Sequence, residues 1–256
     1  MDSREQGKAM IEVRSLDIGY GDLVVLEDLT FDVYKGEIFV ILGGSGCGKS
    51  TLLKHMIGLY EPLSGDILIK GRSMVNADDD EKEDLTRLFG VLYQSGALFS
   101  SLTLEENVAL PLREFTELSE DMISSVAKHK LSLVGLEGFE QFMPSELSGG
   151  MKKRAGLARA MALDPEILFF DEPSAGLDPI SSADLDNLIL ELRNTLGCTM
   201  VIVTHELDSI YSVADRGIIL DKEKKGIIEE GDPRKLRENS SNGWVRQFLN
   251  RSNMRG

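Results

Sequence analysis

The stretch Gly43-Gly44-Ser45-Gly46-Cys47-Gly48-Lys49-Ser50-Thr51 decides the fold class of this chain. Up to Ser50 it fits the pattern G-x-x-x-x-G-K-[ST], and it lies between an apolar run at residues 37–42 and a helix-like segment at residues 50–59. A buried strand, a glycine-rich turn and a helix in this order let backbone N–H groups converge on a phosphate, and the helix N-terminus adds a positive field. The sequence therefore predicts a phosphate-binding unit rather than a turn that only caps a helix.

The side chains of this phosphate loop (residues 43–51) have separate expected roles. Lys49 is expected to reach the β- and γ-phosphates of ATP, Ser50 to be a ligand of Mg²⁺, and Thr51 to donate to the remaining phosphate oxygens. Cys47 is expected to be a small residue that fills a loop position. The alternative is redox control of nucleotide binding, because a helix N-terminus lowers the pKa of a thiol. The backbone expected to hold the nucleotide is that of Gly43, Gly44, Ser45, Gly46, Cys47 and Gly48.

Polar residues also follow two later apolar runs. Asp171 and Glu172 come directly after the run at residues 167–170, at the strand end where open α/β sheets bind ligands. Asp171 is expected to hold the Mg²⁺ shell, and Glu172 to be the general base that activates water. His205 follows the run at residues 199–203 and fits a γ-phosphate sensor. The alternatives are a helix-capping acid pair and a histidine with a local hydrogen bond.

The order of apolar patterns along the chain indicates its architecture. Alternating runs at residues 11–18 and 24–33 predict antiparallel strands, and amphipathic stretches at 104–112, 119–134 and 148–162 predict helices. We expect one α/β domain over residues 1–256. Its core has a mainly parallel sheet with antiparallel N-terminal strands and takes in residues 1–93 and 160–256. Residues 94–159 form an inserted helical subdomain.

Composition excludes several classes of protein. The formal net charge of −15 disfavours binding to nucleic-acid phosphates and adsorption to anionic lipid. The longest apolar runs are far below the roughly 20 residues that span a bilayer, and residues 1–8 lack the apolar core of a signal peptide. Two cysteines without metal-like spacing disfavour disulfides and zinc. We expect a cytoplasmic protein that another protein holds at any membrane where it works.

A second glycine-rich helix start, Leu147-Ser148-Gly149-Gly150-Met151, completes an order of motifs that resembles the ATPase subunits of ABC transporters. The resemblance covers nearly the whole chain. It implies a head-to-tail dimer in which the segment 147–151 of one subunit, the signature segment, closes over the γ-phosphate held by Lys49 of the other. It also implies that Ser148, Gly149 and Gly150 contact ATP, that Tyr20 stacks on adenine, that Gln94 couples the Mg²⁺ site to the transporter, and that Asp178 reaches across the dimer.

A narrower resemblance depends on Met151, where the family normally has glutamine. Together with residues 94–99, 107–114 and 143–146, it is similar to the ATPases of Mce-type lipid transporters, the Mla phospholipid systems among them. This resemblance implies a phospholipid substrate, a membrane permease, an Mce-domain lipid-binding protein and a small cytoplasmic regulatory subunit. It implies peripheral attachment at the cytoplasmic face of the inner membrane. It also implies that a groove in the helical subdomain, with residues 98–112 as its wall, holds short coupling helices of the permease. Some relatives extend well past the position of Asn250, whereas only a few residues follow it here, and the role of such a tail stays open.

Other functions remain open at this point. A signalling ABC ATPase of the cell-division type would bind membrane proteins without moving a substrate, and a soluble ABC ATPase of DNA repair or translation would show tandem domains or a basic surface. The acidic segment 78–84 is expected to begin an exposed helix rather than to bind calcium. Lys152, Lys153 and Arg154 are expected to form a solvated helix face rather than to attract nucleotide or lipid.

Overall fold

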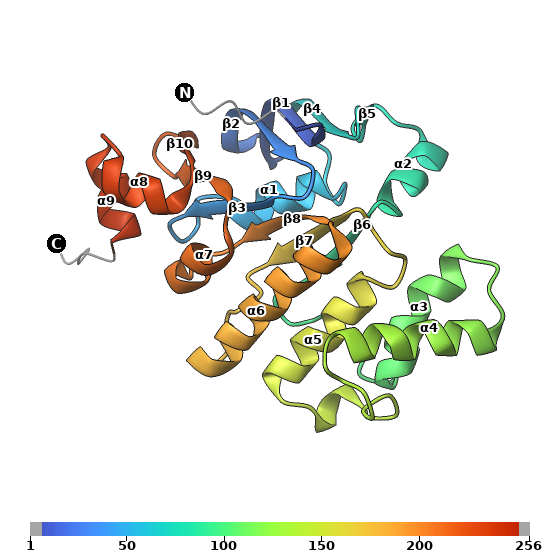
Figure 1. The fold of residues 1–256 in the computed structure, drawn as a ribbon. Coiled ribbons are helices and arrows are strands. Elements are labelled where there is room, and N and C mark those ends of the chain that lie inside the picture. Colours follow the sequence, from blue (N-terminus) through green and yellow to red (C-terminus); the bar gives the residue numbers. More distant parts are fainter. Residues whose placement is uncertain (1–6, 251–256) are drawn as a thin grey trace. The chain divides into compact units, whose positions relative to one another are not determined.

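The chain divides into two compact units, which Figure 1 shows as a ribbon of the computed structural model. The structure describes residues 7–250. The first unit combines Met1–Lys82 with Thr199–Gly256, and the second is Glu83–Cys198. The boundary falls within helix α2 (Asp79–Thr86), which begins close to where the sequence predicts an exposed acidic helix.

The first unit contains an antiparallel sheet with the strand order β2-β1-β4-β5. The long strands β1 and β2 alternate buried and exposed side chains, the pattern of a sheet with one solvated face. They are joined at Gly21, whose φ of 55° is the left-handed conformation that glycine adopts without strain. The four strands are β1 (Ala9–Tyr20), β2 (Leu23–Tyr34), β4 (Ser64–Ile69) and β5 (Arg72–Ser73).

The other sheet portion of the first unit is mainly parallel. Strand β3 (Ile38–Gly43) pairs in parallel with β8 (Thr199–Val203) and β9 (Arg216–Asp221), and β10 (Gly226–Gly231) pairs antiparallel with β9. Every residue of β3 and β8 is buried, as expected for strands covered on both faces. The helices of this unit are α1 (Lys49–Met56), α7 (Leu207–Val213), α8 (Pro233–Asn239) and α9 (Gly243–Leu249).

The second unit combines two parallel strands with a group of helices (Figure 1). Strand β6 (Phe89–Leu92) pairs with β7 (Ile167–Asp171), and the Phe89 and Phe169 rings meet edge to face. The helices are α3 (Leu104–Phe115), α4 (Glu120–Leu133), the 3₁₀ helix η1 (Pro144–Glu146), α5 (Gly149–Ala160) and α6 (Pro179–Leu196). Side chains of Thr103, Ser119, Ser148 and Asp178 cap the four α-helices, each satisfying an N–H group that the helix leaves unpaired.

The predicted mixed α/β fold, with antiparallel strands preceding the phosphate loop, is confirmed. The sequence patterns did not predict β4, β5, β6, β10 or α8, and α3 continues to Phe115 although Pro111 lies within it. No helix within residues 7–250 has both the length and the apolarity that a bilayer crossing requires.

A close backbone contact in the first unit gives a stability prediction. A Cβ added at Gly217, in β9, would overlap the carbonyl oxygen of Val40 in β3. Gly217→Ala should therefore lower the free energy of unfolding by about 1–3 kcal/mol, measured by urea denaturation. Gly243→Ala is the matched control, because a Cβ there meets nothing within 4 Å, and it should change the free energy by less than about 0.5 kcal/mol. Equal effects of the two substitutions would contradict this packing argument.

Candidate functional site

The phosphate loop connects β3 to α1 and is shaped by glycine. Gly43, Gly46 and Gly48 have φ values of 152°, 73° and 100°, which side-chain-bearing residues rarely adopt. At Gly43 there is also no room, because a Cβ would lie 2.5 Å from the Cys47 Sγ and 2.7 Å from the Leu220 oxygen. The Lys49 side chain is buried, and its Nζ donates to the carbonyl oxygens of Gly43 (2.9 Å) and Gly44 (3.1 Å). The ammonium group therefore points into the loop that is predicted to bind phosphate.

Tyr20, the last residue of β1, lies beside the start of α1. Its hydroxyl is 3.3 Å from the Thr51 Oγ1, and its ring meets the Tyr60 ring edge to face at 5.6 Å between centroids. The Tyr20 side chain remains 46% exposed. An exposed aromatic surface next to the phosphate loop is compatible with stacking of a base, and adenine stacking on Tyr20 stays a prediction.

Cys47 lies within the phosphate loop but is buried rather than activated. Burial raises the pKa of its thiol, more strongly than the nearby Lys49 ammonium lowers it. The alternative in which the helix N-terminus gives Cys47 a lowered pKa is therefore contradicted. The thiol packs against the backbone of Gly43, as expected of a small residue that fills a loop position.

His205 is the remaining predicted site residue in the first unit. It follows β8 and is exposed, and its Nε2 lies 3.6 Å from an oxygen of the Glu206 carboxylate. The preceding Thr204 is buried, and its hydroxyl accepts a hydrogen bond from the Glu206 amide at 3.1 Å. This turn fixes the backbone at the end of β8 while leaving the imidazole at the surface, where a sensor of a bound phosphate could act.

The two predicted acids lie at the end of β7 in the second unit. Asp171 is the last residue of the strand, and the four residues before it are buried. Glu172 has a φ of 49°, a left-handed conformation that costs a residue with a Cβ roughly 1–2 kcal/mol. The chain then forms two successive turns, in which the Ala175 amide donates to the Glu172 oxygen (3.2 Å) and the Leu177 amide donates to the Ser174 oxygen (3.1 Å). Glu172 thus begins a tightly turned loop with strained backbone.

Lys153 of α5 holds this loop. Its Nζ donates to the carbonyl oxygens of Glu172 (3.3 Å), Pro173 and Ala175 (2.7 Å), and its side chain is only 5% exposed. Desolvation lowers the pKa of Lys153, although the negative charge of Glu172 opposes that shift. The prediction that Lys152, Lys153 and Arg154 form a solvated helix face is therefore wrong for Lys153, because three carbonyl oxygens replace the water around its ammonium group.

Gln94 lies in the exposed turn after β6, and α5 contacts the loop that follows it. The Arg159 guanidinium donates to the carbonyl oxygens of Ala97 (2.8 Å) and Gly96 (3.2 Å). A Cβ at Gly156 would lie 2.8 Å from the Gly96 oxygen, so the helix and the loop meet backbone to backbone. Helix α5 is thus tied to both the loop after Gln94 and the loop that begins at Glu172.

The signature segment forms the N-terminus of α5. Ser148 is exposed and caps the helix by accepting a hydrogen bond from the Met151 amide at 3.3 Å. Gly149 and Gly150 occupy the first turn, which contains no acidic side chain. An N-terminus of this kind attracts anions.

Asp178 caps α6 and lies on the same unit. Its carboxylate accepts hydrogen bonds from the amides of Ile180 (3.1 Å) and Ser181 (3.0 Å) and from the Ser181 hydroxyl (2.6 Å). The Ser181 hydroxyl is the main cause of the lowered pKa of Asp178. A Cβ at Gly150 would lie 3.7 Å from the Ser181 Cβ, so the starts of α5 and α6 are neighbours.

The predicted site residues divide between the two units. The phosphate loop, Tyr20 and His205 belong to the first, and Gln94, the signature segment, Asp171, Glu172 and Asp178 belong to the second. A family model described as "ABC transporter" matches residues 26–175. The chain belongs to the ABC transporter family. The predicted ATP hydrolysis is likewise confirmed, since the matched family is that of nucleotide-binding ATPases and solved cassettes share its fold.

Relatives within the ABC transporter family match almost the whole chain. It is 44% identical to the "Probable ribonucleotide transport ATP-binding protein mkl" of Mycobacterium leprae over 97% of the chain and 71% of that protein. It is 42% identical to the "Intermembrane phospholipid transport system ATP-binding protein MlaF" of Haemophilus influenzae over 94% of the chain and 90% of that protein. For the Escherichia coli K12 protein of the same description, the identity is 40% over 94% and 88%.

Solved ABC structures share the fold. The cbiO1 protein of Clostridium perfringens, described as part of the ABC transporter complex cbiONQ, superposes with a TM-score of 0.80 at 28% identity over 90% of this chain and 95% of that one. The dimeric ABC transporter cassette MJ0796 gives a TM-score of 0.78 at 30% identity over 86% and 97%.

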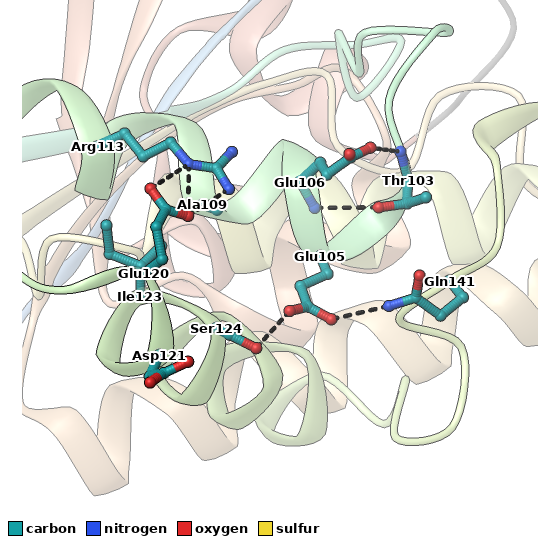
Figure 2. Close-up of a pocket in the computed structure, with 10 residues that line it drawn as sticks. All are labelled: Thr103, Glu105, Glu106, Ala109, Arg113, Glu120, Asp121, Ile123, Ser124 and Gln141. Atoms are coloured by element: carbon teal, nitrogen blue, oxygen red, sulfur yellow. Dashed lines mark hydrogen bonds and ion pairs between the residues drawn. The ribbon is translucent and has the colours of Figure 1, made fainter.

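Helices α3 and α4 border a cleft of about 340 Å³, shown in Figure 2. In Figure 2, Glu105 accepts hydrogen bonds from Ser124 and from Gln141, and Arg113 forms an ion pair with Glu120 at 2.8 Å. Carboxylates outnumber cations among the lining residues. The residues that line the cleft are Thr103, Glu105, Glu106, Ala109, Arg113, Glu120, Asp121, Ile123, Ser124 and Gln141.

Two basic residues near the site, Lys153 and Arg159, were missed by sequence reasoning. For Lys153 a signal was present, because it lies on the same helix face as Gly156 and Leu157, three and four residues later, and both of these are buried. A lysine within an apolar stripe is rarely solvated and needs acceptors for its charge.

The burial of Cys47 generates a prediction about thiol chemistry. Both cysteines of the chain are buried, and burial raises the pKa of each thiol. Since the thiolate is the reacting form, a disulfide reagent should modify the native protein at pH 7.5 at least about tenfold more slowly than the urea-unfolded chain, and the native rate should still be rising at pH 9. Labelling of one thiol per native chain at the unfolded rate would revive the hypothesis of redox control.

Proposed function

We propose that this ATPase powers the movement of phospholipid between membranes through a permease partner. The observation that carries the proposal is the 42% and 40% identity to two MlaF proteins, which the chain matches over 90% and 88% of their length. Met151, which ends the signature segment where the family normally has glutamine, supports the same assignment.

One relative favours another substrate. The Mycobacterium leprae protein is described as a probable ribonucleotide transport ATP-binding protein and is 44% identical. An ATPase subunit does not itself contact the transported molecule, so its site residues do not decide between the two substrates. Phospholipid remains our proposal, because the match to MlaF takes in nearly the full length of both chains, and ribonucleotide is the alternative.

The chain's own residues suit each part of ATP hydrolysis. In this proposal the backbone amides of the phosphate loop and the Lys49 ammonium bind the phosphates, as the direction of the Lys49 side chain supports. Glu172 accepts a proton from the attacking water, and the turned loop that follows β7 restricts the orientation of its backbone. His205 donates a hydrogen bond to the terminal phosphate and so distinguishes ATP from ADP.

Mg²⁺ fits the donor chemistry of the remaining residues. The hydroxyl of Ser50, the carboxylate of Asp171 and the amide oxygen of Gln94 are hard oxygen donors of the kind that Mg²⁺ prefers. When bound, the cation neutralises charge on the phosphates.

The exposed residues Ser148 and Gly149 of the signature segment support a dimer as the active form. A helix N-terminus with a serine hydroxyl and two glycines binds an anion well, and a second copy can bring ATP to it. In this proposal Ser148, Gly149 and Gly150 of one subunit contact the γ-phosphate held by the phosphate loop of the other, Tyr20 stacks on adenine, and Asp178 reaches across. The dimeric MJ0796 cassette is the structural parallel.

The helical subdomain is proposed to receive the permease. Residues 98–112, expected as the groove wall, contribute Thr103, Glu105, Glu106 and Ala109 to the cleft of Figure 2. Exposed Phe99 adds an apolar contact at the same segment. Carboxylates beside an apolar residue suit an amphipathic segment with basic side chains, the chemistry we propose for the permease's coupling helices.

The identity to the MlaF proteins supports the proposed location and partners. The chain attaches peripherally to the cytoplasmic face of the inner membrane through the permease, with an Mce-domain lipid-binding protein and a small cytoplasmic regulatory subunit in the same complex. The proposed subdomain boundaries remain 94–159 for the helical part and 1–93 with 160–256 for the core. The segment after Asn250 lies outside the residues that the structure describes, and its role stays open.

Glu172→Gln tests the assignment of the base. The amide keeps the size of the carboxylate but cannot accept the proton, so kcat for ATP hydrolysis should fall about 100- to 10,000-fold while ATP binding persists. ATP-bound dimer should accumulate and be detected by size-exclusion chromatography. Lys49→Ala is the contrasting variant, in which γ-phosphate stabilisation is lost and no such dimer forms. A wild-type rate in Glu172→Gln would refute the assignment.

Transport is tested with the complex itself. A tagged chain purified from membranes should bring down a permease and an Mce-domain protein. The complex, reconstituted in vesicles that contain a fluorescent phospholipid, should move the lipid in the presence of ATP. The same complex with Glu172→Gln should move none. ATP-dependent movement of a ribonucleotide instead would favour the alternative substrate, and a division-type membrane partner without transport would overturn the proposal.

A further inference from the structure

Lys153 connects two motifs that have separate roles in the proposed mechanism, the signature segment and the loop that begins at Glu172. Its ammonium group bonds to the carbonyl oxygens of Glu172, Pro173 and Ala175, and its backbone belongs to α5, which begins at the signature segment. Lys153 lies five positions after the capping Ser148, about 7.5 Å along a helix axis. Less than one and a half turns of α5 therefore join the predicted anion site to the residue that holds the loop of the predicted base.

The three contacts of Lys153 hold the part of the loop that sets the orientation of Glu172. Glu172 has a left-handed backbone, and such strain persists only where surrounding groups hold it in place. The Ala175 amide closes one turn onto the Glu172 oxygen, and the Lys153 ammonium binds that oxygen and those of Pro173 and Ala175. A charged donor makes stronger hydrogen bonds than a neutral one, and burial removes competing water.

We propose that Lys153 is a positioning residue that aims Glu172 and makes the base of each subunit depend on the placement of its own signature helix. This inference rests on the proposed role of Glu172. When the N-terminus of α5 closes on the ATP held by a second copy, the helix carries Lys153 with it, and Lys153 sets the backbone of the 172–175 loop. Contact of the signature segment with the ATP on the second copy thereby changes the orientation of Glu172, the base that acts on the ATP bound by its own subunit.

The expected signature is a loss of kcat without a loss of ATP affinity. Lys153→Met removes the ammonium group but keeps an unbranched side chain of similar length, so Glu172 loses its orientation while the phosphate loop is untouched. In the full-length chain, kcat should fall about 10- to 100-fold, as small misplacements of catalytic groups do, and KM for ATP should stay within about threefold. ATP-bound dimer should accumulate, as in Glu172→Gln.

Two further variants separate positioning from general stability. Lys153→Arg keeps a cation with several donors and should recover most of the lost kcat. Lys152→Met removes the same charge one residue earlier, on a half-buried side chain, and should leave kcat within about twofold of wild type. Thermal unfolding is measured for each variant. If Lys153→Met does not fold, Lys153→Gln takes its place under the same criterion for kcat.

The double variant decides whether Lys153 acts through Glu172. If it does, adding Lys153→Met to Glu172→Gln should not lower the residual single-turnover rate further, because the group being positioned has lost its function. A second loss of the same size would overturn the proposal, and so would a wild-type kcat in folded Lys153→Met while Glu172→Gln is inactive. A wild-type rate in Glu172→Gln itself would instead contradict the proposed function.

Discussion

The lack of space for a side chain at Gly43 is the constraint on which the first unit depends. Strand β3 is buried along its whole length between β8 and β9, and the chain must leave it within one residue, beside the Leu220 carbonyl and the Cys47 sulfur. Only a residue without Cβ fits there. The tight exit lets the loop curl back so that Lys49 lies inside it, and the same lack of space excludes water from Cys47.

The second unit has a comparable constraint, and charged side chains satisfy it. The chain turns sharply after β7, which ends at Asp171, and the carbonyl oxygens of the turn that begins at Glu172 lie where water is scarce. The Lys153 ammonium satisfies three of them, and the Arg159 guanidinium satisfies two more in the loop after Gln94. Both cations come from α5. One helix thus stabilises the two polar loops of this unit by replacing their solvent with fixed donors.

Local sequence was sufficient to predict an element where a single segment contains the whole pattern of that element. The phosphate loop combines glycines, a lysine and a helix start within nine residues, and β8 is a continuous apolar run, so both were predictable. Lys153 was not, since its acceptors lie about twenty residues later in the chain and only the fold brings them to α5. The raised pKa of Cys47 was not predictable from local sequence for a related reason: a local dipole lowers a thiol pKa, whereas tertiary burial raises it, and burial is the larger effect here. The short strands β4 and β6 mix glycine or charge with apolar residues, which weakens their period.

The glycines around α5 affect how variation in this chain would be interpreted. A Cβ at Gly90 would overlap the Ala160 oxygen, and Cβ atoms at Gly96 and Gly156 would each lie 2.8 Å from a facing carbonyl oxygen, those of Lys152 and Gly96. Backbone cannot be trimmed by a compensating substitution, so natural selection would retain these glycines even in a descendant that had lost ATP hydrolysis. Invariance near the motifs would therefore record how closely the chain is packed, and a count of invariant positions would overestimate the number of residues that take part in chemistry.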